Sequence, residues 1–303
     1  MIVLLCPGQG SQKPGFLNSW LEDDSFKQNI EALSETISID LIKHGTLSDE
    51  ETIRDTAIAQ PLIVAASIAT ANLLNRTSVA GVAGHSVGEV AASYISGVLT
   101  ESEAISLVNI RAKAMADAAK ATTGTGMAAI LGGDEELVLA KLKEFDLYPA
   151  NFNGSGQIVA AGLSSKIQEL VANPPQGSKV IPLSVAGAFH TSFMEPAVSK
   201  LSDFVATLEP KDPSMKLWSN QKGQLVDSGK EFLDLLVGQV ANSVRWDLCM
   251  KSMVEAGVTG VIELSPGGTL SGLAKRGMPG IEIVALKQPE DLEAAKALIA
   301  SEG

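Results

Sequence analysis

Cysteine, histidine and long apolar runs are scarce in this sequence of 303 residues. Its two cysteines, Cys6 and Cys249, lie far apart and beside no further cysteine or histidine at metal-ligand spacing, so they indicate neither a disulfide framework nor a zinc site. The N-terminal apolar run stops at Pro7 and follows no basic leader, and no later window holds the roughly 18 apolar residues of a membrane span. These absences predict a soluble, cytoplasmic protein without a bound metal.

Positive charge is scarce as well, with 23 basic residues against 35 acidic ones and a net charge of −12. This balance argues against nucleic acid or an anionic membrane surface as the main partner. An acidic ligand must therefore meet a local basic patch. Lys275 and Arg276, followed by Lys287, form one candidate, although such a cluster is more often an ordinary solvated surface.

Short aliphatic runs that end in turn residues alternate with segments of helical periodicity. The strand-like runs are residues 2–6, 79–83, 180–185 and 258–264, and the helical segments include residues 57–75 and 101–120. Strands that alternate with helices are typical of a parallel α/β sheet. The chain is therefore predicted to have an α/β fold.

A glycine-flanked serine follows the strand-like run at 79–83. Gly84, His85, Ser86, Val87 and Gly88 match the G-x-S-x-G pattern, in which the glycines allow a tight strand-to-helix turn that exposes the serine hydroxyl. Helix-forming residues come next, so the serine is expected at a helix N-terminus, where the N–H of the following valine favours a developing oxyanion. The alternative is an ordinary glycine-rich turn, and the flanking strand and helix patterns weaken it.

A serine nucleophile needs a base, and the chain has only three histidines. His44 lies in a polar segment expected at the surface, and the side chain of His85 leaves the turn in another direction. His190 follows an apolar segment and is the predicted base, with a buried structural histidine as the alternative. No acid between Ser86 and His190 stands out as the third member of a triad, which leaves a dyad oriented by a backbone carbonyl.

Residues 121–189 follow a different order of elements: strand, helix, strand, strand, helix, strand. This order is typical of a ferredoxin-like unit, with Gly124 and Gly126 at one end and Gly187 at the other as candidate hinges. The predicted architecture is a parallel-sheet, α/β-hydrolase-like large domain formed by residues 1–120 and 190–303. The small domain is inserted into it, and a cleft separates the two.

An arginine interrupts the apolar stripe of the helical segment 101–120. The stripe consists of Ala104, Leu107, Val108, Met115 and Ala118. Arg111 lies in its middle, where burial of an unpaired guanidinium would cost several kcal/mol, so an anion must meet it. A protein carboxylate and a substrate carboxylate are equal alternatives on spacing alone; the planar fork of arginine suits either.

With these residues in place, the whole chain resembles malonyl-CoA:acyl carrier protein transacylases, especially the single-domain actinobacterial form. The matching motifs are PGQGSQ at 7–12, AQP at 59–61, GHSVGE at 84–89, GAFH at 187–190, GQVANSVRW at 238–246 and SPGGTLSGLAKR at 265–276. The resemblance implies transfer of a malonyl group from coenzyme A to acyl carrier protein through an ester on a serine, in support of fatty acid biosynthesis. It also implies a monomer that needs no cofactor, because the coenzyme A thioester is a substrate.

The resemblance assigns the reacting groups by position. Ser86 corresponds to the acylated nucleophile and His190 to its base. The backbone N–H of Gln9 would join that of Val87 in the oxyanion hole. The main-chain carbonyl of Gln239 would orient the histidine, which accounts for the missing acid.

Four further positions are implied to bind substrate. Arg111 corresponds to the arginine that pairs with the free carboxylate of malonate. Gln60 and Asn153 occupy positions that line the family's cleft. Phe189 resembles the malonyl-selective pattern of modular polyketide acyltransferases rather than the methylmalonyl pattern.

Three other classes of protein share part of this pattern. A serine thioesterase or hydrolase has the same turn but needs no carboxylate-pairing arginine. Gly8 and Gly10 after a strand suggest a nucleotide-binding protein, but Lys13 stands where the dinucleotide fingerprint requires a glycine. A non-catalytic scaffold for carrier docking would have no need of a nucleophile, a base and a buried arginine together.

Overall fold

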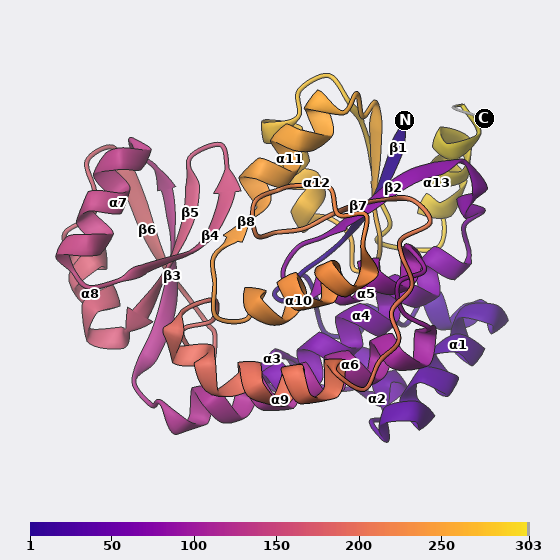
Figure 1. The fold of residues 1–303 in the computed structure, drawn as a ribbon, viewed down its shortest axis with the longest axis horizontal. Helices are drawn as coiled ribbons and strands as arrows, with labels where there is room; N and C mark the ends of the chain where they lie inside the picture. Colours follow the sequence, from indigo (N-terminus) through magenta and orange to yellow (C-terminus); the bar gives the residue numbers. More distant parts are fainter. Residues whose placement is uncertain (302–303) are drawn as a thin grey trace.

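The first strand of the chain, β1 (Ile2–Cys6), runs through the middle of a five-stranded parallel sheet in the order β10-β9-β1-β2-β7 (Figure 1). The structure is a computed structural model and describes residues 1–301. All of β1 is buried. Its side chains alternate between two cores, one containing Leu4 and the other Leu5, so a continuous apolar run is needed here. The predicted parallel α/β sheet is confirmed.

The other four strands of this sheet include two that the sequence indicated and two that it did not. These strands are β2 (Val79–Gly84), β7 (Lys216–Trp218), β9 (Gly260–Glu263) and β10 (Glu282–Ala285). Strands β2 and β9 fall within the predicted aliphatic runs. Strands β7 and β10 lie at the two edges and are too short, and β10 too exposed, to stand out as apolar runs.

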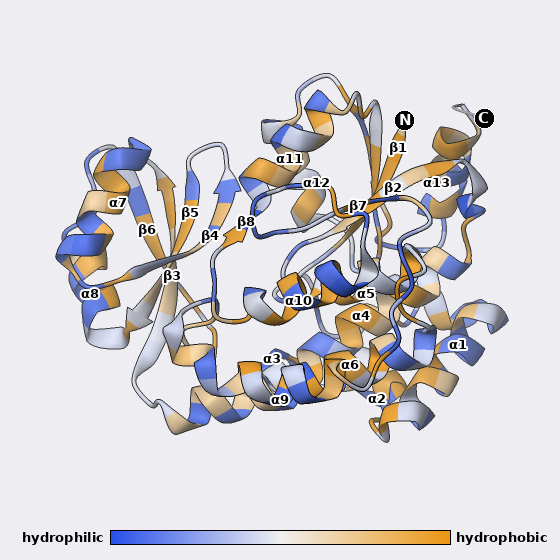
Figure 2. Cartoon of the chain, viewed as in Figure 1, coloured by the Kyte–Doolittle hydropathy of each residue, from blue (hydrophilic) through white to orange (hydrophobic). Residues whose placement is uncertain are grey.

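Helices pack on both faces of this sheet and around the second sheet. They are α1 (Asp24–Ile37), α2 (Leu41–Thr46), α3 (Glu50–Arg54), α4 (Thr56–Asn72), α5 (Gly88–Ile95), α6 (Glu101–Ala121), α7 (Glu135–Glu144), α8 (Ser164–Ala172), α9 (Glu195–Val205), α10 (Gly229–Gln239), α11 (Trp246–Glu255), α12 (Thr269–Gly277) and α13 (Asp291–Ala300). Figure 2 shows hydrophobic residues along the strands of the parallel sheet and hydrophilic residues along much of α8. Apolar side chains therefore concentrate where helices meet the sheet.

Helices α4 and α6 correspond to the two helical segments predicted from periodicity. Asp55 caps α4 by accepting the N–H of Ala57 at 2.8 Å. Thr100 and Glu103 form a reciprocal capping box at the start of α6. Helix α4 is buried along nearly its whole length and packs against α6, which also packs against α9. The arginine-bearing helix is therefore held from two sides.

The second sheet has the strand order β6-β3-β5-β4-β8. Its first four strands are β3 (Thr125–Gly132), β4 (Tyr148–Gly154), β5 (Gln157–Leu163) and β6 (Ser178–Leu183). These pair antiparallel, and with α7 and α8 they follow the order strand, helix, strand, strand, helix, strand. Figure 1 shows this sheet with α7 and α8 at one end of the molecule, away from the parallel sheet.

Two features of the second sheet differ from the sequence-based expectations. The run at 180–185 was counted with the strands that alternate with helices and also as the last strand of the ferredoxin-like unit; β6 pairs antiparallel with β3, so only the second assignment agrees with the structure. A fifth strand, β8 (Val244–Arg245), comes from outside residues 121–189 and pairs parallel with β4. The second sheet therefore extends beyond the predicted insertion, and the limits of a separate small domain stay a prediction.

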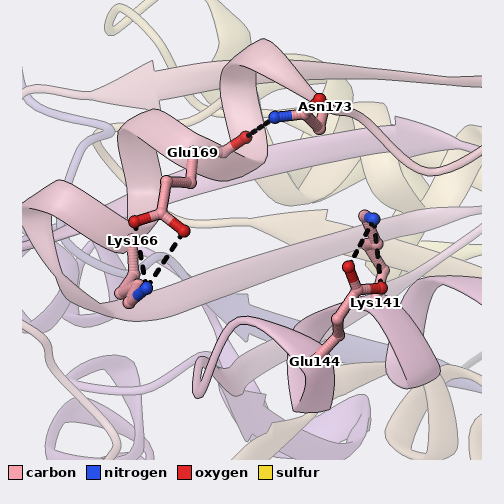
Figure 3. Close-up of polar contacts among 5 residues, drawn as sticks. All are labelled: Lys141, Glu144, Lys166, Glu169 and Asn173. Atoms are coloured by element: carbon pink, nitrogen blue, oxygen red, sulfur yellow. Dashed lines mark hydrogen bonds and ion pairs between the residues drawn. The ribbon is translucent and has the colours of Figure 1, made fainter.

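The outer helices of this second sheet carry exposed ion pairs. Lys141 bonds Glu144 on α7 and Lys166 bonds Glu169 on α8, each at 2.9 Å with a spacing of three residues (Figure 3). Such exposed pairs contribute only about 0.3–0.5 kcal/mol each. Within residues 1–301, no helix combines the length and the apolar character needed to cross a lipid bilayer.

We expect Leu4→Ala to lower the free energy of unfolding by about 2–5 kcal/mol, because it leaves a cavity in a fully buried strand. Leu47→Ala is the matched control, since Leu47 is 82% exposed and its truncation should change stability by no more than about 0.5 kcal/mol. Urea denaturation followed by circular dichroism measures both. Equal effects of the two substitutions would contradict the central position of β1.

Candidate active site

Ser86 lies at a sharp turn between β2 and α5. Its φ is 54°, in the left-handed region that most residues avoid. A Cβ atom at Gly84 would lie 2.0 Å from the carbonyl carbon of Gly88, and one at Gly88 would lie 2.1 Å from the carbonyl oxygen of Cys6. Only glycine fits at either position. The two glycines of the motif thus let the strand and helix approach closely enough to expose the serine.

The serine hydroxyl faces a histidine from a distant part of the chain. Ser86 Oγ lies 2.7 Å from His190 Nε2, and His190 Nδ1 lies 2.9 Å from the main-chain oxygen of Gln239. A carbonyl oxygen only accepts hydrogen bonds, so Nδ1 must carry the proton and Nε2 is the free acceptor in the neutral ring. The dyad geometry suits proton removal from the serine.

The surroundings of His190 favour its neutral form. Burial lowers the pKa of His190 to about 3, and the positive charge of Arg111 acts in the same direction. The hydrogen bond to the carbonyl of Gln239 opposes this shift only in part. A buried histidine beside a guanidinium is therefore ready to accept a proton at neutral pH, but holds it weakly.

Arg111 lies fully buried beside this pair. Its Nη1 donates to Gln60 Oε1 at 2.7 Å and its Nη2 to Gln239 Oε1 at 2.9 Å, while Nη2 is also 3.5 Å from Ser86 Oγ. Among residues 1–301, Arg111 Nε has no hydrogen-bond partner and no carboxylate forms an ion pair with the guanidinium. Burial lowers its pKa to about 10, so the group stays charged at neutral pH. Of the two alternatives left by the sequence, a direct protein carboxylate is absent.

Two residues that the sequence-based reasoning did not assign complete this network. Asn220 accepts the N–H of Ser86 at 2.8 Å and donates to the carbonyl of Gly84 at 2.7 Å, which braces the turn. Glu89 is fully buried and accepts from the backbone N–H of Asn220 at 2.7 Å and from the side-chain amide of Gln239. Burial raises the pKa of Glu89 to about 8, against the N–H of Asn220 and the charge of Arg111.

The sequence contains a signal for Glu89 but none for Asn220. Glu89 stands between Gly88 and an otherwise apolar segment of helix α5, where it interrupts a buried face, much as Arg111 does on α6. The same test of an ionisable residue on an apolar face would have found it. Asn220 lies after a three-residue edge strand, in a loop without periodicity. Only the tertiary structure brings Asn220 to the serine.

Of the two predicted oxyanion donors, Gln9 lines the cavity that contains Ser86, and Val87 directly follows the serine. Val87 precedes the first residue of α5, and Gln9 follows β1. Within residues 1–301, neither backbone N–H bonds another backbone group. The side chain of Gln9 is held by Thr56 at 3.3 Å and by Gln60 at 3.4 Å. Both N–H groups therefore stay free for an oxygen that develops charge next to Ser86.

A cavity of about 450 Å³ opens above Ser86 and is lined by both parts of the molecule. Gln60, Phe189 and Asn153 contribute to its wall. Asn153 Oδ1, on β4, accepts a hydrogen bond from His85 Nε2 at 2.9 Å and so links the two sides of the cavity. Among the described residues, no group of three or more histidine, cysteine or acidic side chains is arranged to hold a metal ion.

The candidate basic patch is only partly associated with this cavity. Lys275, Arg276 and Lys287 are all exposed. Arg276 lines the cavity and donates to Gln157 at 3.2 Å, whereas Lys275 and Lys287 do not line it. The three residues therefore do not form a single cleft-facing cluster.

A parallel sheet that presents a serine, a histidine and free N–H groups to a cavity has the arrangement typical of enzymes that use a serine nucleophile. The sequence model of the family described as "Acyl transferase domain" matches residues 3–293. The match covers nearly the whole chain, and the chain belongs to this family.

Similar proteins carry a more specific description. The malonyl CoA-acyl carrier protein transacylase of Mycobacterium tuberculosis (strain H37Rv) is 47% identical over 298 residues, which cover 97% of this chain and 98% of that protein. The crystal structure of MCAT from M. tuberculosis superposes with a TM-score of 0.94 at 44% identity, covering 98% of this chain and 99% of the other. A malonyl-transacylase in complex with a type II PKS acyl-carrier protein reaches 0.92 at 29% identity, with 98% and 99% covered.

We expect Gly84→Ala to destabilise the protein by about 1–3 kcal/mol or more, because the new methyl group would overlap the backbone of Gly88. Gly238→Ala on α10 is the matched control: a Cβ there meets nothing within 4 Å, and alanine should be neutral or stabilising by up to about 1 kcal/mol. Thermal unfolding by differential scanning fluorimetry compares the two. A Gly84→Ala protein as stable as the wild type would argue against the tight turn.

The reactivity of Ser86 should stay nearly constant as the pH falls from about 7 to about 5. An ordinary histidine would become protonated over this range, but His190, with its pKa lowered to about 3, stays neutral and keeps accepting from the serine. Glu89, with its pKa raised to about 8, also keeps one protonation state. The rate of labelling by a serine-directed fluorophosphonate, corrected for hydrolysis of the probe, measures this. A loss of labelling with a midpoint near the ordinary histidine value would contradict it.

Proposed function

We propose that the chain is a malonyl-CoA:acyl carrier protein S-malonyltransferase, which supplies fatty acid biosynthesis through an ester on Ser86. Membership of the acyl transferase family and the names of its relatives support this proposal. The observation that carries the malonyl specificity is the buried guanidinium of Arg111, whose Nη2 lies 3.5 Å from Ser86 Oγ. A malonyl group bound to that oxygen would place its free carboxylate beside the guanidinium of Arg111.

The first half of the reaction loads the serine. His190 Nε2 takes the proton from Ser86 Oγ as this oxygen attacks the thioester carbonyl carbon of malonyl-CoA. The N–H groups of Gln9 and Val87 stabilise the resulting oxyanion. When the oxyanion collapses, the carbon–sulfur bond breaks, His190 returns the proton to the sulfur, and coenzyme A leaves as a thiol.

The second half runs in the opposite direction with a different thiol. The phosphopantetheine thiol of acyl carrier protein gives its proton to His190 and attacks the carbonyl carbon of the malonyl ester. The bond between that carbon and Ser86 Oγ breaks, and the serine oxygen regains the proton from His190. The carbonyl of Gln239 keeps the same histidine tautomer throughout both halves.

Arg111 provides the selection for a carboxylate at the end of the acyl chain. In a malonyl ester, only the carbonyl carbon and one methylene separate this carboxylate from the serine oxygen, which matches the short distance to the guanidinium. The malonyl carboxylate would be a direct counterion for Arg111, which has none among the described residues. An acetyl group would leave the buried charge uncompensated, so its transfer should be disfavoured.

Three further residues are proposed to shape the malonyl site. Gln60 holds Arg111 Nη1 in place from α4. Phe189 precedes the catalytic histidine and contributes an apolar wall to the cavity. Asn153 lies on the opposite wall, where its amide is within reach of a polar substrate group.

The same chemistry bears on cofactor use, and the net charge bears on the partners of the chain. Serine, histidine and backbone N–H groups carry out every step, so we propose that no cofactor takes part and that coenzyme A enters only as a substrate. The chain is further proposed to act as a monomer in the cytoplasm. A net charge of −12 does not favour nucleic acid or an anionic membrane surface as a partner.

Intact-mass spectrometry after brief incubation with malonyl-CoA or acetyl-CoA tests the proposal. We expect a malonyl adduct on the wild type, none on Ser86→Ala, and little acetyl adduct. Arg111→Ala should lower the rate of malonyl acylation by roughly 100-fold or more, since a buried charge partner is worth about 3–5 kcal/mol. Lys113→Ala removes an exposed charge from the same helix and should have no effect.

The outcome separates the proposed transferase from a serine hydrolase. A transferase should keep its malonyl adduct in water and release it when the acyl carrier protein bearing phosphopantetheine is added. Rapid release without the carrier, or equal malonyl and acetyl adducts, would favour the thioesterase or hydrolase. Absence of any adduct on the wild type would contradict both enzymes.

A further inference from the structure

The side chain of Gln239 lies between two buried ionisable groups, the guanidinium of Arg111 and the carboxyl group of Glu89. Its Oε1 accepts from Arg111 Nη2 at 2.9 Å, and its Nε2 donates to a carboxylate oxygen of Glu89. Gln239, Arg111 and Glu89 are each at most 2% exposed. The amide therefore connects the guanidinium to the carboxylate, which do not touch each other.

This connection works in only one orientation of the amide. If the amide of Gln239 were reversed, its NH₂ group would face the guanidinium of Arg111, which has donors only, and its oxygen would face the carboxylate of Glu89. In the observed orientation, Nε2 also points toward the carbonyl oxygen of Ser86 and Oδ1 of Asn220, each at 3.1 Å. Acceptors surround one end of the amide and a donor meets the other.

Glu89 makes the shortest of the three contacts that favour this orientation. One of its oxygens is occupied by the backbone N–H of Asn220 at 2.7 Å, which has no freedom to turn away, and the other faces Gln239. A carboxyl group keeps an acceptor lone pair on both oxygens in either protonation state, whereas a glutamine has an acceptor at one end only. Glutamate is therefore required to serve two N–H donors at this position.

We propose that Glu89 is a positioning residue for malonyl selection: through the amide of Gln239 it holds Arg111 in the place where the guanidinium meets the acyl carboxylate. This inference rests on the proposed malonyl transfer and adds to it the group that keeps the arginine aligned. Glu89 does not touch the substrate. Its effect is separate from that of the main-chain carbonyl of Gln239, which orients His190.

Glu89→Gln tests the proposal. The oxygen of the new amide would face the N–H of Asn220, so its NH₂ group would meet Nε2 of Gln239 and turn that amide round. A donor would then face Arg111 and displace the guanidinium. We expect the rate of malonyl acylation by malonyl-CoA to fall about 10- to 100-fold, as for the loss of a buried hydrogen-bond acceptor of a charged group, while acetyl acylation changes less than about threefold.

A double-mutant cycle gives a readout that a purely structural role would not move. In an Arg111→Ala background, Glu89→Gln should leave the ratio of malonyl to acetyl acylation unchanged, because the group through which it acts is gone. Glu136→Gln is the matched control, an acid-to-amide change at an exposed position on α7. All rates are measured by intact mass, with circular dichroism to establish that each variant is folded.

A second variant covers the case in which Glu89→Gln does not fold. Gln239→Met removes the side-chain amide but keeps the main-chain carbonyl that holds His190, so the same selective loss of malonyl acylation is expected. Equal loss of malonyl and acetyl acylation, or no loss in a folded variant, would overturn the role of Glu89 and Gln239 while leaving the transferase intact. Failure of the wild type to form a malonyl ester would instead overturn the proposed function.

Discussion

The nucleophile Ser86, its base His190, the cation Arg111 and the buried Glu89 all contact Gln239. Its carbonyl fixes the tautomer of His190, its amide oxygen accepts from Arg111, and its amide nitrogen donates to Glu89 and toward the backbone of Ser86. The residue ends helix α10, so a single helix terminus sets the positions of the nucleophile, the base and the cation together. Buried polar networks of this kind are rigid only when every member is satisfied.

The same network meets two opposing requirements of the buried guanidinium of Arg111. A buried guanidinium needs acceptors, but a direct carboxylate partner would compete with a carboxylate substrate. Here two glutamine oxygens hold Arg111, and the carboxyl group of Glu89 is one amide away. The cation is kept in place without being neutralised by direct contact. The same positive charge lowers the pKa of His190, which favours its neutral form.

Much of this arrangement could be predicted from local patterns. The strand-to-helix turn at Ser86 and the two long helices follow from apolar periodicity and from glycines in fixed positions. Arg111 was found as a charge on an apolar face, and its burial is confirmed. The edge strands β7 and β10 were missed because they are three and four residues long. The run at 180–185 fitted both the parallel alternation and the ferredoxin-like unit, because an apolar run carries no information about its pairing partner, and the structure places it in the second sheet.

The sequence by itself determined which chemistry is available. It contains a serine at a turn that only glycines permit, one histidine, His190, that remains as a base once His44 and His85 are set aside, and a cation on a buried helix face. These features depend on neighbours within one or two helical turns, so local spacing records them. Only the tertiary structure decided which of these groups meet. Asn220 lies 134 residues from Ser86, and Gln239 lies 128 residues from Arg111. Contacts over such separations arise from the packing of sheets and helices, whose order is set by the burial of the whole core.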